Sequence, residues 1–160
     1  GSFGSQIMVG GFLLNNELTD FSFLPEKDGA PVANRMAPGK RPRSSMAPTI
    51  VFDANDKLRL VVGSPGGSRI IGYVAKTLIA VLGWNMDIQS AIDLGHLVNR
   101  NRFTDLESGT SAVELQPALE ALGNRVQIRD MNSGLHGIEI VDNTLRGGAD
   151  PRREGEARGD

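Results

Sequence analysis

The chain of 160 residues has no cysteine, which excludes disulfide bonds, thiolate metal sites and a cysteine nucleophile. It has one tryptophan and one tyrosine, and 17 basic against 19 acidic residues leave a formal net charge of −2. Nucleic-acid binding requires a basic surface and aromatic side chains for stacking, so we expect no nucleic-acid partner. No run reaches the roughly 18 consecutive apolar residues of a membrane span, so we expect none in this chain.

The first residues, Gly1-Ser2-Phe3-Gly4-Ser5, contain neither an initiator methionine nor a charged segment followed by an apolar one, as in a signal peptide. They lead without a linker into the apolar residues Ile7-Met8-Val9. This predicts a break inside a domain, with residues 1–146 forming one portion of that domain. From Gly147 onward the composition is Gly, Arg, Glu and Asp, so we expect residues 147–160 to form a polar tail too hydrophilic to bury.

The hydrophobic pattern predicts a mixed helix and sheet protein. Residues 6–14 suit one strand or two short strands around Gly10-Gly11, and residues 49–52 and 58–62 suit a hairpin. Five of the eight prolines lie between Phe23 and Pro48, which favours a loop without regular structure.

Further along the chain, cap residues indicate three helices. Ser68 predicts a buried helix over 69–82, Asp87 one over 88–97, and Pro117 with Gly123 a short one over 117–122. The runs 112–115, 126–129 and 137–141 are rich in strand-forming residues and predict three strands.

The segment Gly63-Ser64-Pro65-Gly66-Gly67-Ser68 joins a predicted strand to a predicted helix. Successive glycines leave backbone N–H groups unblocked where a helix begins and partial positive charge accumulates, so an anion or a developing oxyanion can bind there. The segment has neither the Gly-Lys-Ser/Thr ending of a P-loop nor the Gly-x-Gly-x-x-Gly spacing of a dinucleotide site. The alternative is a tight structural turn.

Two further pairs of polar residues suit the ends of an amino acid. Glu17 and Asp20 can hold an ammonium group, and the hydroxyls of Ser44 and Ser45 can donate to a carboxylate. The alternative for each pair is a solvated turn. No Gly-x-Ser-x-Gly elbow surrounds the serines, and neither histidine is near the acidic pair in sequence, so we expect no serine nucleophile and no metal. We expect His96 in the core and His136 in a loop.

Several motifs together resemble the small subunit of the γ-glutamyltransferase (glutathione hydrolase) family in order and spacing. They are Phe3-Gly4, Leu14-Asn15-Asn16-Glu17, Asp20-Phe21-Ser22, Lys40-Arg41-Pro42, Ser44-Ser45-Met46, Pro48-Thr49-Ile50 and Gly63-Ser64-Pro65-Gly66-Gly67-Ser68-Arg69. The segment Ala149-Asp150-Pro151-Arg152-Arg153 resembles the end of that family's chains.

The resemblance implies an α+β fold that belongs to the four-layer αββα sandwich of N-terminal-nucleophile hydrolases. It implies that Glu17 and Asp20 bind the α-amino group of a γ-glutamyl donor, that Ser44 and Ser45 bind its α-carboxylate, and that Gly66 and Gly67 form the oxyanion hole. No cofactor is implied. The nucleophilic threonine of the family, in a Thr-Thr-His start, belongs upstream of Gly1, so we expect the isolated chain to be inactive.

The same resemblance implies partners and a location. The large subunit and the N-terminal portion of the small subunit would complete the enzyme, and strand edges left open without them would recruit another copy of the chain. Bacterial members are exported, which implies a periplasmic or extracellular location. The loop 23–43 is shorter than in members with a lid, which predicts an open site. There are two alternatives. One is a related acylase acting on cephalosporins or poly-γ-glutamate, and the other is a non-catalytic amino-acid-binding module.

Overall fold

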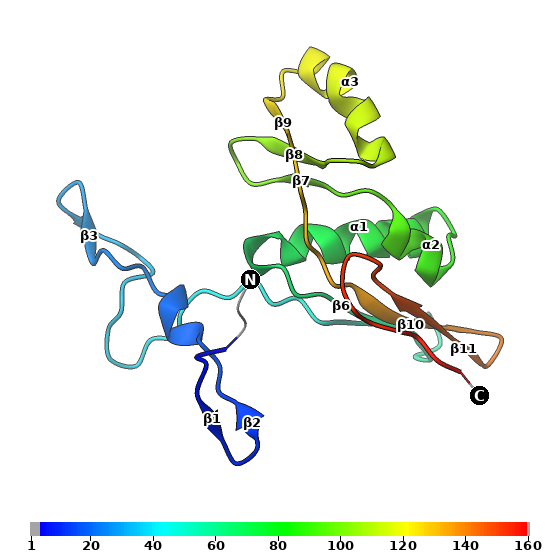
Figure 1. Cartoon of the computed structure of the whole chain (residues 1–160), viewed down its shortest axis with the longest axis horizontal. Coiled ribbons are helices and arrows are strands. Elements are labelled where there is room, and N and C mark those ends of the chain that lie inside the picture. The colour runs from blue at the N-terminus through cyan, green and yellow to red at the C-terminus, as the bar shows by residue number, and fades with distance from the viewer. Residues whose placement is uncertain (1–3, 160) are drawn as a thin grey trace. The chain divides into compact units, whose positions relative to one another are not determined.

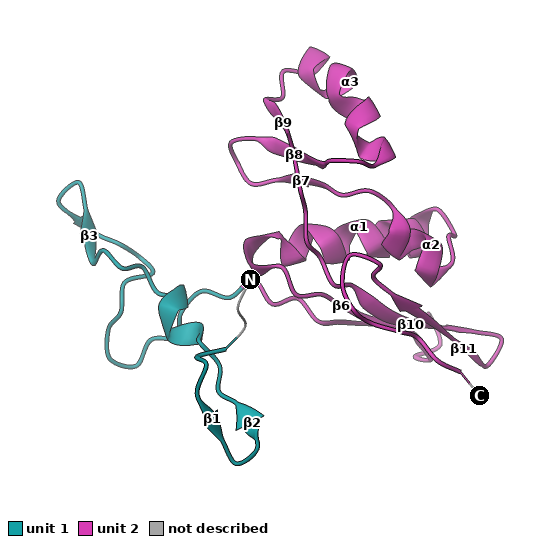
Figure 2. Cartoon of the chain, in the orientation of Figure 1, with its two compact units in different colours: residues 1–44 teal, residues 45–160 magenta. Residues whose placement is uncertain are grey.

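The computed structural model describes residues 4–159, and its contacts divide the chain into two units, residues 1–44 and 45–160 (Figure 2). The first unit consists of small hairpins and one helical turn (Figure 1). Strands β1 (Met8–Val9) and β2 (Phe12–Leu13) pair antiparallel around Gly10-Gly11, both of which have positive φ. Of the two arrangements that the sequence allowed, one strand or two short ones, the structure shows two.

The predicted irregular loop after Phe23 also contains a hairpin, so that prediction is wrong in part. Strands β3 (Glu26–Lys27) and β4 (Ala30–Pro31) pair across a turn in which Asp28 and Gly29 have positive φ. Phe21 is buried, but the other large apolar side chains described in this unit are mostly exposed, with Phe23 at 86%. This unit therefore has little core of its own.

The second unit is built on a four-stranded antiparallel sheet in the order β11-β10-β6-β5. Its strands are β5 (Thr49–Phe52), β6 (Leu58–Gly63), β10 (His136–Val141) and β11 (Thr144–Ala149). The predicted hairpin over 49–62 and the predicted strand over 137–141 are confirmed. The sequence predicted His136 in a loop, but this residue begins β10, so that prediction is wrong.

Two helices, α1 (Ile70–Gly83) and α2 (Ile88–Asp93), cover one face of this sheet (Figure 1). The core between them contains Leu60 and Val62 of β6, Tyr73 and Val74 of α1, and three buried residues of α2. Helix α2 lies so close to the sheet that a Cβ on Gly137 or Gly148 would come within 2.8 Å of an isoleucine side chain. Glycine at these positions allows the helix to pack directly on the backbone of β10 and β11.

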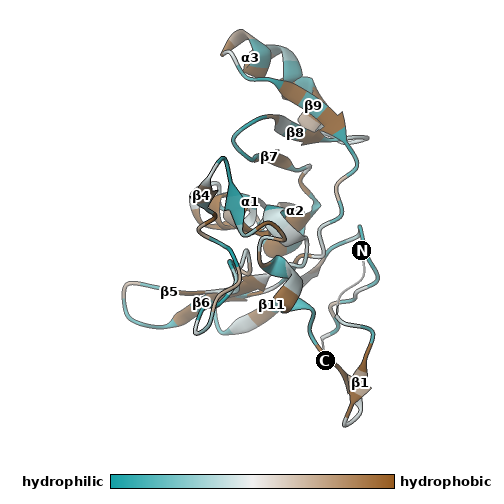
Figure 3. Cartoon of the chain, turned by 90° about the vertical axis from the view of Figure 1, so that its left-hand side faces the viewer, coloured by the Kyte–Doolittle hydropathy of each residue, from teal (hydrophilic) through white to brown (hydrophobic). Residues whose placement is uncertain are grey.

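The opposite face of the sheet carries exposed apolar side chains, and hydrophobic residues recur along β5 and β6 (Figure 3). Strand register places Ile50, Val61 and Ile138 in one row across three strands, pointing away from the helices, and each is at least 36% exposed. Phe52 and Leu58 form a second exposed pair in the same sheet. A monomeric protein seldom exposes so large an apolar surface, so this face is suited to a contact.

A second sheet of three strands follows α2, in the order β7-β8-β9. Strand β7 (Leu97–Asn99) pairs antiparallel with β8 (Thr104–Glu107), and β8 pairs parallel with β9 (Val126–Arg129) through a crossover containing the 3₁₀ turn η3 (Ser111–Leu115) and helix α3 (Gln116–Ala121). Gly72 of α1 lies against Val98 of β7, which packs this sheet on the helix.

Four further predictions from the sequence require correction. The strand predicted over 112–115 is η3, whose first turn is capped by Thr110. The helix predicted over 88–97 is capped by Asp87 as expected but ends at Asp93, and β7 begins at Leu97.

The first predicted helix is not capped by Ser68, because Ser68 lies within a preceding 3₁₀ turn and its hydroxyl accepts a hydrogen bond from Arg100. Nor is α1 buried all round, since Ile71 and Ile79 are more than half exposed. The described portion of the chain contains no helix that is both long and apolar enough to cross a membrane.

Candidate active site

The glycine loop, residues 63–67, connects the end of β6 to the 3₁₀ turn η2 (Gly67–Arg69), which continues into α1. Gly66 has φ of 138° and Gly67 has φ of 59°, conformations that residues with a side chain rarely adopt. A Cβ on Gly66 would lie 2.6 Å from Cε2 of the buried Tyr73, whereas one on Gly67 would meet nothing within 4 Å. Gly66 is therefore required by packing and backbone, and Gly67 by backbone alone.

The amide groups of Gly66 and Gly67 are available to a ligand. Within residues 4–159, neither N–H donates a hydrogen bond to another group of the protein. Both lie where η2 and α1 begin, so the aligned peptide dipoles add partial positive charge. Two unpaired N–H groups at such a position can stabilise an anion or an oxyanion.

Neighbouring segments hold the glycine loop in place. The Ser64 hydroxyl accepts a hydrogen bond from the amide of Gly134 at 3.2 Å, and Gly134 lies so close that a Cβ there would be 2.7 Å from Pro65. On the other side of the loop, the Arg69 guanidinium donates to Asp105 through Nε at 3.2 Å and through Nη2 at 2.7 Å. Asp105 is buried in β8, so this ion pair ties the start of the helix to the second sheet.

A buried polar network lies behind this loop, in the segment that the sequence suggested was too polar to bury. Asp150 is 1% exposed, and its Oδ2 accepts hydrogen bonds from the Ser133 hydroxyl at 2.5 Å and from the Leu135 amide at 2.9 Å. Arg152 donates to Glu107 at 2.5 Å and 2.8 Å and pairs with Asp150 at 3.1 Å. The expectation fails for Gly148 and Asp150, which are buried because strand pairing and opposite charges satisfy the polar groups, while Gly147 and Pro151 are exposed.

The network also explains where α2 ends. Lys76 Nζ donates to the carbonyl of Leu94 at 2.7 Å, and Arg152 donates to the carbonyls of Ile92 and Leu94 at 3.2 Å and 3.1 Å. Two cations thus bind carbonyls on either side of Asp93, a favourable position for positive charge at a helix C-terminus. Burial lowers the pKa of Lys76 to about 8, and the nearby Arg152 acts in the same direction.

His96 is fully buried, as the sequence predicted, and its Nε2 lies 2.7 Å from the Ser133 hydroxyl. Its ring packs on Tyr73 with 4.2 Å between the ring centroids. Burial lowers the pKa of His96 to about 3, and the positive charges of Lys76 and Arg152 act in the same direction. The imidazole is therefore neutral at physiological pH, and it is a structural residue.

The pKa of Asp150 is also lowered. Burial alone would raise it, but hydrogen bonds from the Ser133 hydroxyl, from the amides of Leu135 and Arg152, and from the Arg152 guanidinium together outweigh that effect. Asp150 is therefore a carboxylate that the network keeps ionised.

The predicted ligands for the ammonium group lie in the first unit. Glu17 and Asp20 share one 3₁₀ turn, η1 (Glu17–Asp20), and both are exposed. The side-chain oxygen of Asn15 accepts from the backbone amide of Glu17 at 3.0 Å, and the side-chain Nδ2 of Asn34 donates to the carbonyl of Asp20 at 2.7 Å. The structure thus brings these two carboxylates onto one turn, and their binding of an ammonium group stays a prediction.

The predicted serines lie at the division between the units, with Ser44 the last residue of the first and Ser45 the first residue of the second. Ser44 is exposed and Ser45 is half-buried. Gly66 and Gly67 lie together in the second unit, so the convergence of all six residues on one ligand stays a prediction. In residues 4–159 no three His, Cys, Asp or Glu side chains are grouped so that they could hold a metal ion.

Comparison with known proteins decides the family. The gamma-glutamyltranspeptidase family profile matches residues 1–160. The chain belongs to the gamma-glutamyltranspeptidase family. It is 35% identical over 162 residues to the glutathione hydrolase proenzyme of Bacillus subtilis strain 168, covering 98% of this chain and 27% of that protein. It is 36% identical over 164 residues to the glutathione hydrolase proenzyme of Escherichia coli K12, covering 94% and 27%.

The fold agrees with that of solved family members. The crystal structure of Helicobacter pylori gamma-glutamyltranspeptidase superposes with a TM-score of 0.81 and 33% identity, over 95% of this chain and 88% of that chain. The resemblance inferred from the motifs and the mixed helix and sheet class are therefore confirmed. The chain spans about a quarter of the length of the two glutathione hydrolase proenzymes.

Proposed function

We propose that this chain supplies the donor-recognition and oxyanion-hole portion of a γ-glutamyltransferase, which cleaves γ-glutamyl amides such as glutathione and passes the glutamyl group to water or to an acceptor amine. The observation that carries the proposal is the pair of unpaired amides on Gly66 and Gly67 at the start of α1, in a chain of the gamma-glutamyltranspeptidase family. The names of the relatives, glutathione hydrolase proenzymes, support the substrate class.

Each predicted site residue has a role in this reaction. Glu17 and Asp20 accept hydrogen bonds from the donor α-ammonium, and the hydroxyls of Ser44 and Ser45 donate to its α-carboxylate. These charge-assisted contacts fix the γ-carbonyl. A threonine hydroxyl from outside residues 1–160 adds to the γ-carbonyl carbon, and the carbonyl oxygen takes the negative charge.

Gly66 and Gly67 donate to this oxyanion. The C–N bond then breaks, the leaving nitrogen takes the proton that the threonine hydroxyl gave up and departs as an amine, and an ester remains on the threonine. Water or a second amine adds to the ester carbonyl and releases the glutamyl product. The isolated chain is inactive on this proposal, because its own residues bind the donor but contain no nucleophile for it.

The same proposal extends to the architecture. We place the four-stranded sheet in one half of a four-layer αββα sandwich, with its apolar face against a second sheet. The exposed row Ile50, Val61 and Ile138 supports this, because α1 and α2 cover only the other face. The large subunit and the N-terminal portion of the small subunit would supply the covering layers. Residues 147–160 would complete the domain begun by residues 1–146, and uncovered strand edges would recruit a second copy. The location would be periplasmic or extracellular.

The experiment uses the complete precursor that contains this chain and follows release of p-nitroaniline from γ-glutamyl-p-nitroanilide. Asp20→Ala should raise KM about 10- to 100-fold, because one charge-assisted contact is lost. The matched control is Glu26→Ala, which removes an exposed carboxylate from β3 of the same unit. Equal kinetics for both variants would contradict the assignment of Asp20.

The oxyanion role has its own test. Gly67→Ala, where a methyl group meets no neighbour but the backbone is forced to move, should lower kcat about 100-fold or more with little change in KM. A kcat within about threefold of the parent would refute the assignment of this amide. Release of p-nitroaniline by the purified 160-residue chain would refute the proposed inactivity.

A further inference from the structure

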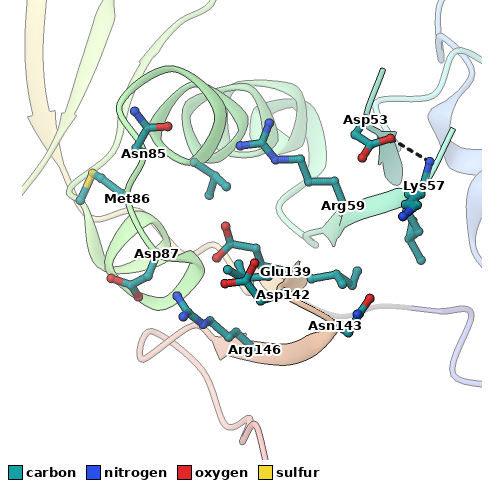
Figure 4. A pocket seen from close by; sticks show the side chains of 14 residues that line it. Asp53, Lys57, Arg59, Asn85, Met86, Asp87, Glu139, Asp142, Asn143 and Arg146 are labelled. Carbon is teal, nitrogen blue, oxygen red and sulfur yellow. Dashed lines mark hydrogen bonds between the residues drawn. The ribbon is translucent and has the colours of Figure 1, made fainter. Parts of the chain in front are cut away.

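A pocket of about 730 Å³ lies at the end of the four-stranded sheet where β6 begins, so the length of β6 separates it from the glycine loop (Figure 4). Its walls come from β6, β10, β11, the turns beside them and the residues after α1, all within the second unit. Its volume falls within the usual range for small-molecule sites. None of the predicted site residues lines it.

The pocket contains charges of both signs. The four carboxylates that line it are Asp53, Asp87, Glu139 and Asp142. The three cations are Lys57, Arg59 and Arg146. One negative charge is therefore in excess, and a ligand that matches this pattern carries an anionic group together with more than one cationic group.

Glu139 is the buried group that requires a ligand. Its side chain points into the pocket from β10, the residue is only 7% exposed, and its Oε2 accepts no hydrogen bond from any residue that the structure describes (Figure 4). Arg146 is its cross-strand partner in β11 and lines the same pocket, but within the described residues no ion pair joins the two side chains. A buried carboxylate oxygen without a donor is unfavourable, so a cationic donor entering the pocket would be bound there.

Two of the other carboxylates are already satisfied. Asp53 accepts from the amides of Lys57 and Asn55, and Asp87 accepts from the amide of Ser90. Hydrogen bonds lower the pKa of both aspartates, at Asp53 from the Lys57 and Asn55 amides and at Asp87 from the Ser90 side chain and then the Ser90 amide, so both contribute negative charge without needing a ligand. Among the described residues of the pocket, the buried acceptor without a donor is Glu139, and the guanidinium groups of Arg59 and Arg146 supply donors on the basic side.

We propose that this pocket binds a small basic amino acid, with an ammonium group donating to Glu139 and the carboxylate accepting from Arg59 and Arg146. The second cationic group of the ligand neutralises the remaining negative charge. This pocket is separate from the glycine loop, and it is a candidate for binding an effector. Bidentate geometry between guanidinium and carboxylate gives the arginines their selectivity for the anionic end.

The test is calorimetric titration of the complete 160-residue chain with L-lysine. L-lysine should bind with a Kd of about 1 mM or below. Cadaverine, which is lysine without its carboxylate, and hexanoate, which has no ammonium group, should each bind about tenfold more weakly or worse. Glu139→Gln should weaken lysine binding about tenfold or more, whereas Ser45→Ala should leave it unchanged.

A second variant protects the test if Glu139→Gln does not fold. Arg146→Met changes a mostly exposed strand residue and should weaken lysine binding about tenfold while leaving cadaverine binding unchanged, since cadaverine has no carboxylate. Absence of heat with about 20 mM L-lysine, well above the expected Kd, from a chain that melts cooperatively would overturn the proposal, as would equal affinity in parent and Glu139→Gln. Equal weakening by Ser45→Ala would also overturn it, because the ligand would then occupy the γ-glutamyl site.

Discussion

Replacing Gly66 by alanine is the sharpest perturbation that the structure offers. The φ of 138° at Gly66 is unfavourable for any residue with a side chain, and the new methyl carbon would lie 2.6 Å from Cε2 and 3.1 Å from Cδ2 of Tyr73. Tyr73 cannot turn away freely, because it is 1% exposed and packs on His96. The chain therefore has to move the glycine loop, the tyrosine or both.

The cost of Gly66→Ala can be worked from these contacts. Unfavourable backbone conformation costs roughly 1–3 kcal/mol and overpacking of a filled core costs about the same again. The sum is about 4 kcal/mol of unfolding free energy. For a chain of this length, each kcal/mol corresponds to roughly 2–4 °C, so the melting temperature should fall by about 8–16 °C.

The matched control is Gly67→Ala, one residue further along. Gly67 also has positive φ, but a Cβ there meets no atom within 4 Å, so only the backbone cost of about 1 kcal/mol or slightly more applies. Thermal unfolding of both variants, followed by circular dichroism, compares them directly. If Gly66→Ala is no more destabilising than Gly67→Ala, the close packing of Gly66 on Tyr73 does not hold in solution and the reasoning is refuted.

Three further predictions concern the second unit. Arg152→Met leaves the buried carboxylates of Glu107 and Asp150 without their cation, and should reduce the unfolding free energy in urea by about 3–5 kcal/mol. His96, with its pKa lowered to about 3 in the folded state and near 6.5 when unfolded, binds protons only in the unfolded state between those values. Lowering the pH from about 7 to 5 should therefore reduce the free energy of unfolding by about 2 kcal/mol through this residue, and His96→Gln should remove that part of the pH dependence. Ile138→Lys should change the stability of this chain by less than about 1 kcal/mol and lower its binding of a hydrophobic dye, but should destabilise the complete precursor by several kcal/mol.

Each of these predictions has an internal check. The Arg158 side chain is 80% exposed and, among the described residues, forms an ion pair with the exposed Glu156 alone, so Arg158→Met should be neutral within about 0.5 kcal/mol. If Arg152→Met lowers the free energy of unfolding no more than Arg158→Met does, the stabilising role of the buried network around Arg152 is refuted. If the free energy of unfolding of His96→Gln depends on pH as steeply as that of the parent, the protons taken up on unfolding bind to other groups. A precursor that tolerates Ile138→Lys would contradict the second sheet proposed to cover this face.

Much of the local structure was predictable from the sequence, because it depends on residues adjacent in the chain. Two glycines at 10–11 allowed a tight hairpin, Asp87 capped α2, and the apolar alternation over 49–62 indicated β5 and β6. The family resemblance was also predictable, since it depends on short motifs at fixed spacing. The pairing of Glu17 with Asp20 on one turn follows from their separation of three residues.

The sequence did not predict β8 or the burial of residues after Gly147, because ion pairs with distant residues, and not a periodic apolar pattern, bury them. Strand β8 contains Asp105 and Glu107, which are buried only because Arg69 and Arg152 reach them from elsewhere in the fold. Nothing in the sequence near β8 indicates those partners, so the strand was missed. The acidic and basic residues after Gly147 have the composition of a solvated tail, and their distant partners are equally invisible in the local sequence.

These missed charges connect the tail of the chain to the proposed oxyanion hole. Asp150 binds the Ser133 hydroxyl, Arg153 donates to the Ser133 carbonyl at 2.7 Å, and the adjacent Gly134 donates to Ser64 in the glycine loop. A loop whose amides must remain free for a ligand cannot be held by its own N–H groups. It has to be held through side chains and neighbouring backbone. Here Gly134, 70 residues beyond Ser64, holds the loop, and Asp150 and Arg153 hold the adjacent Ser133.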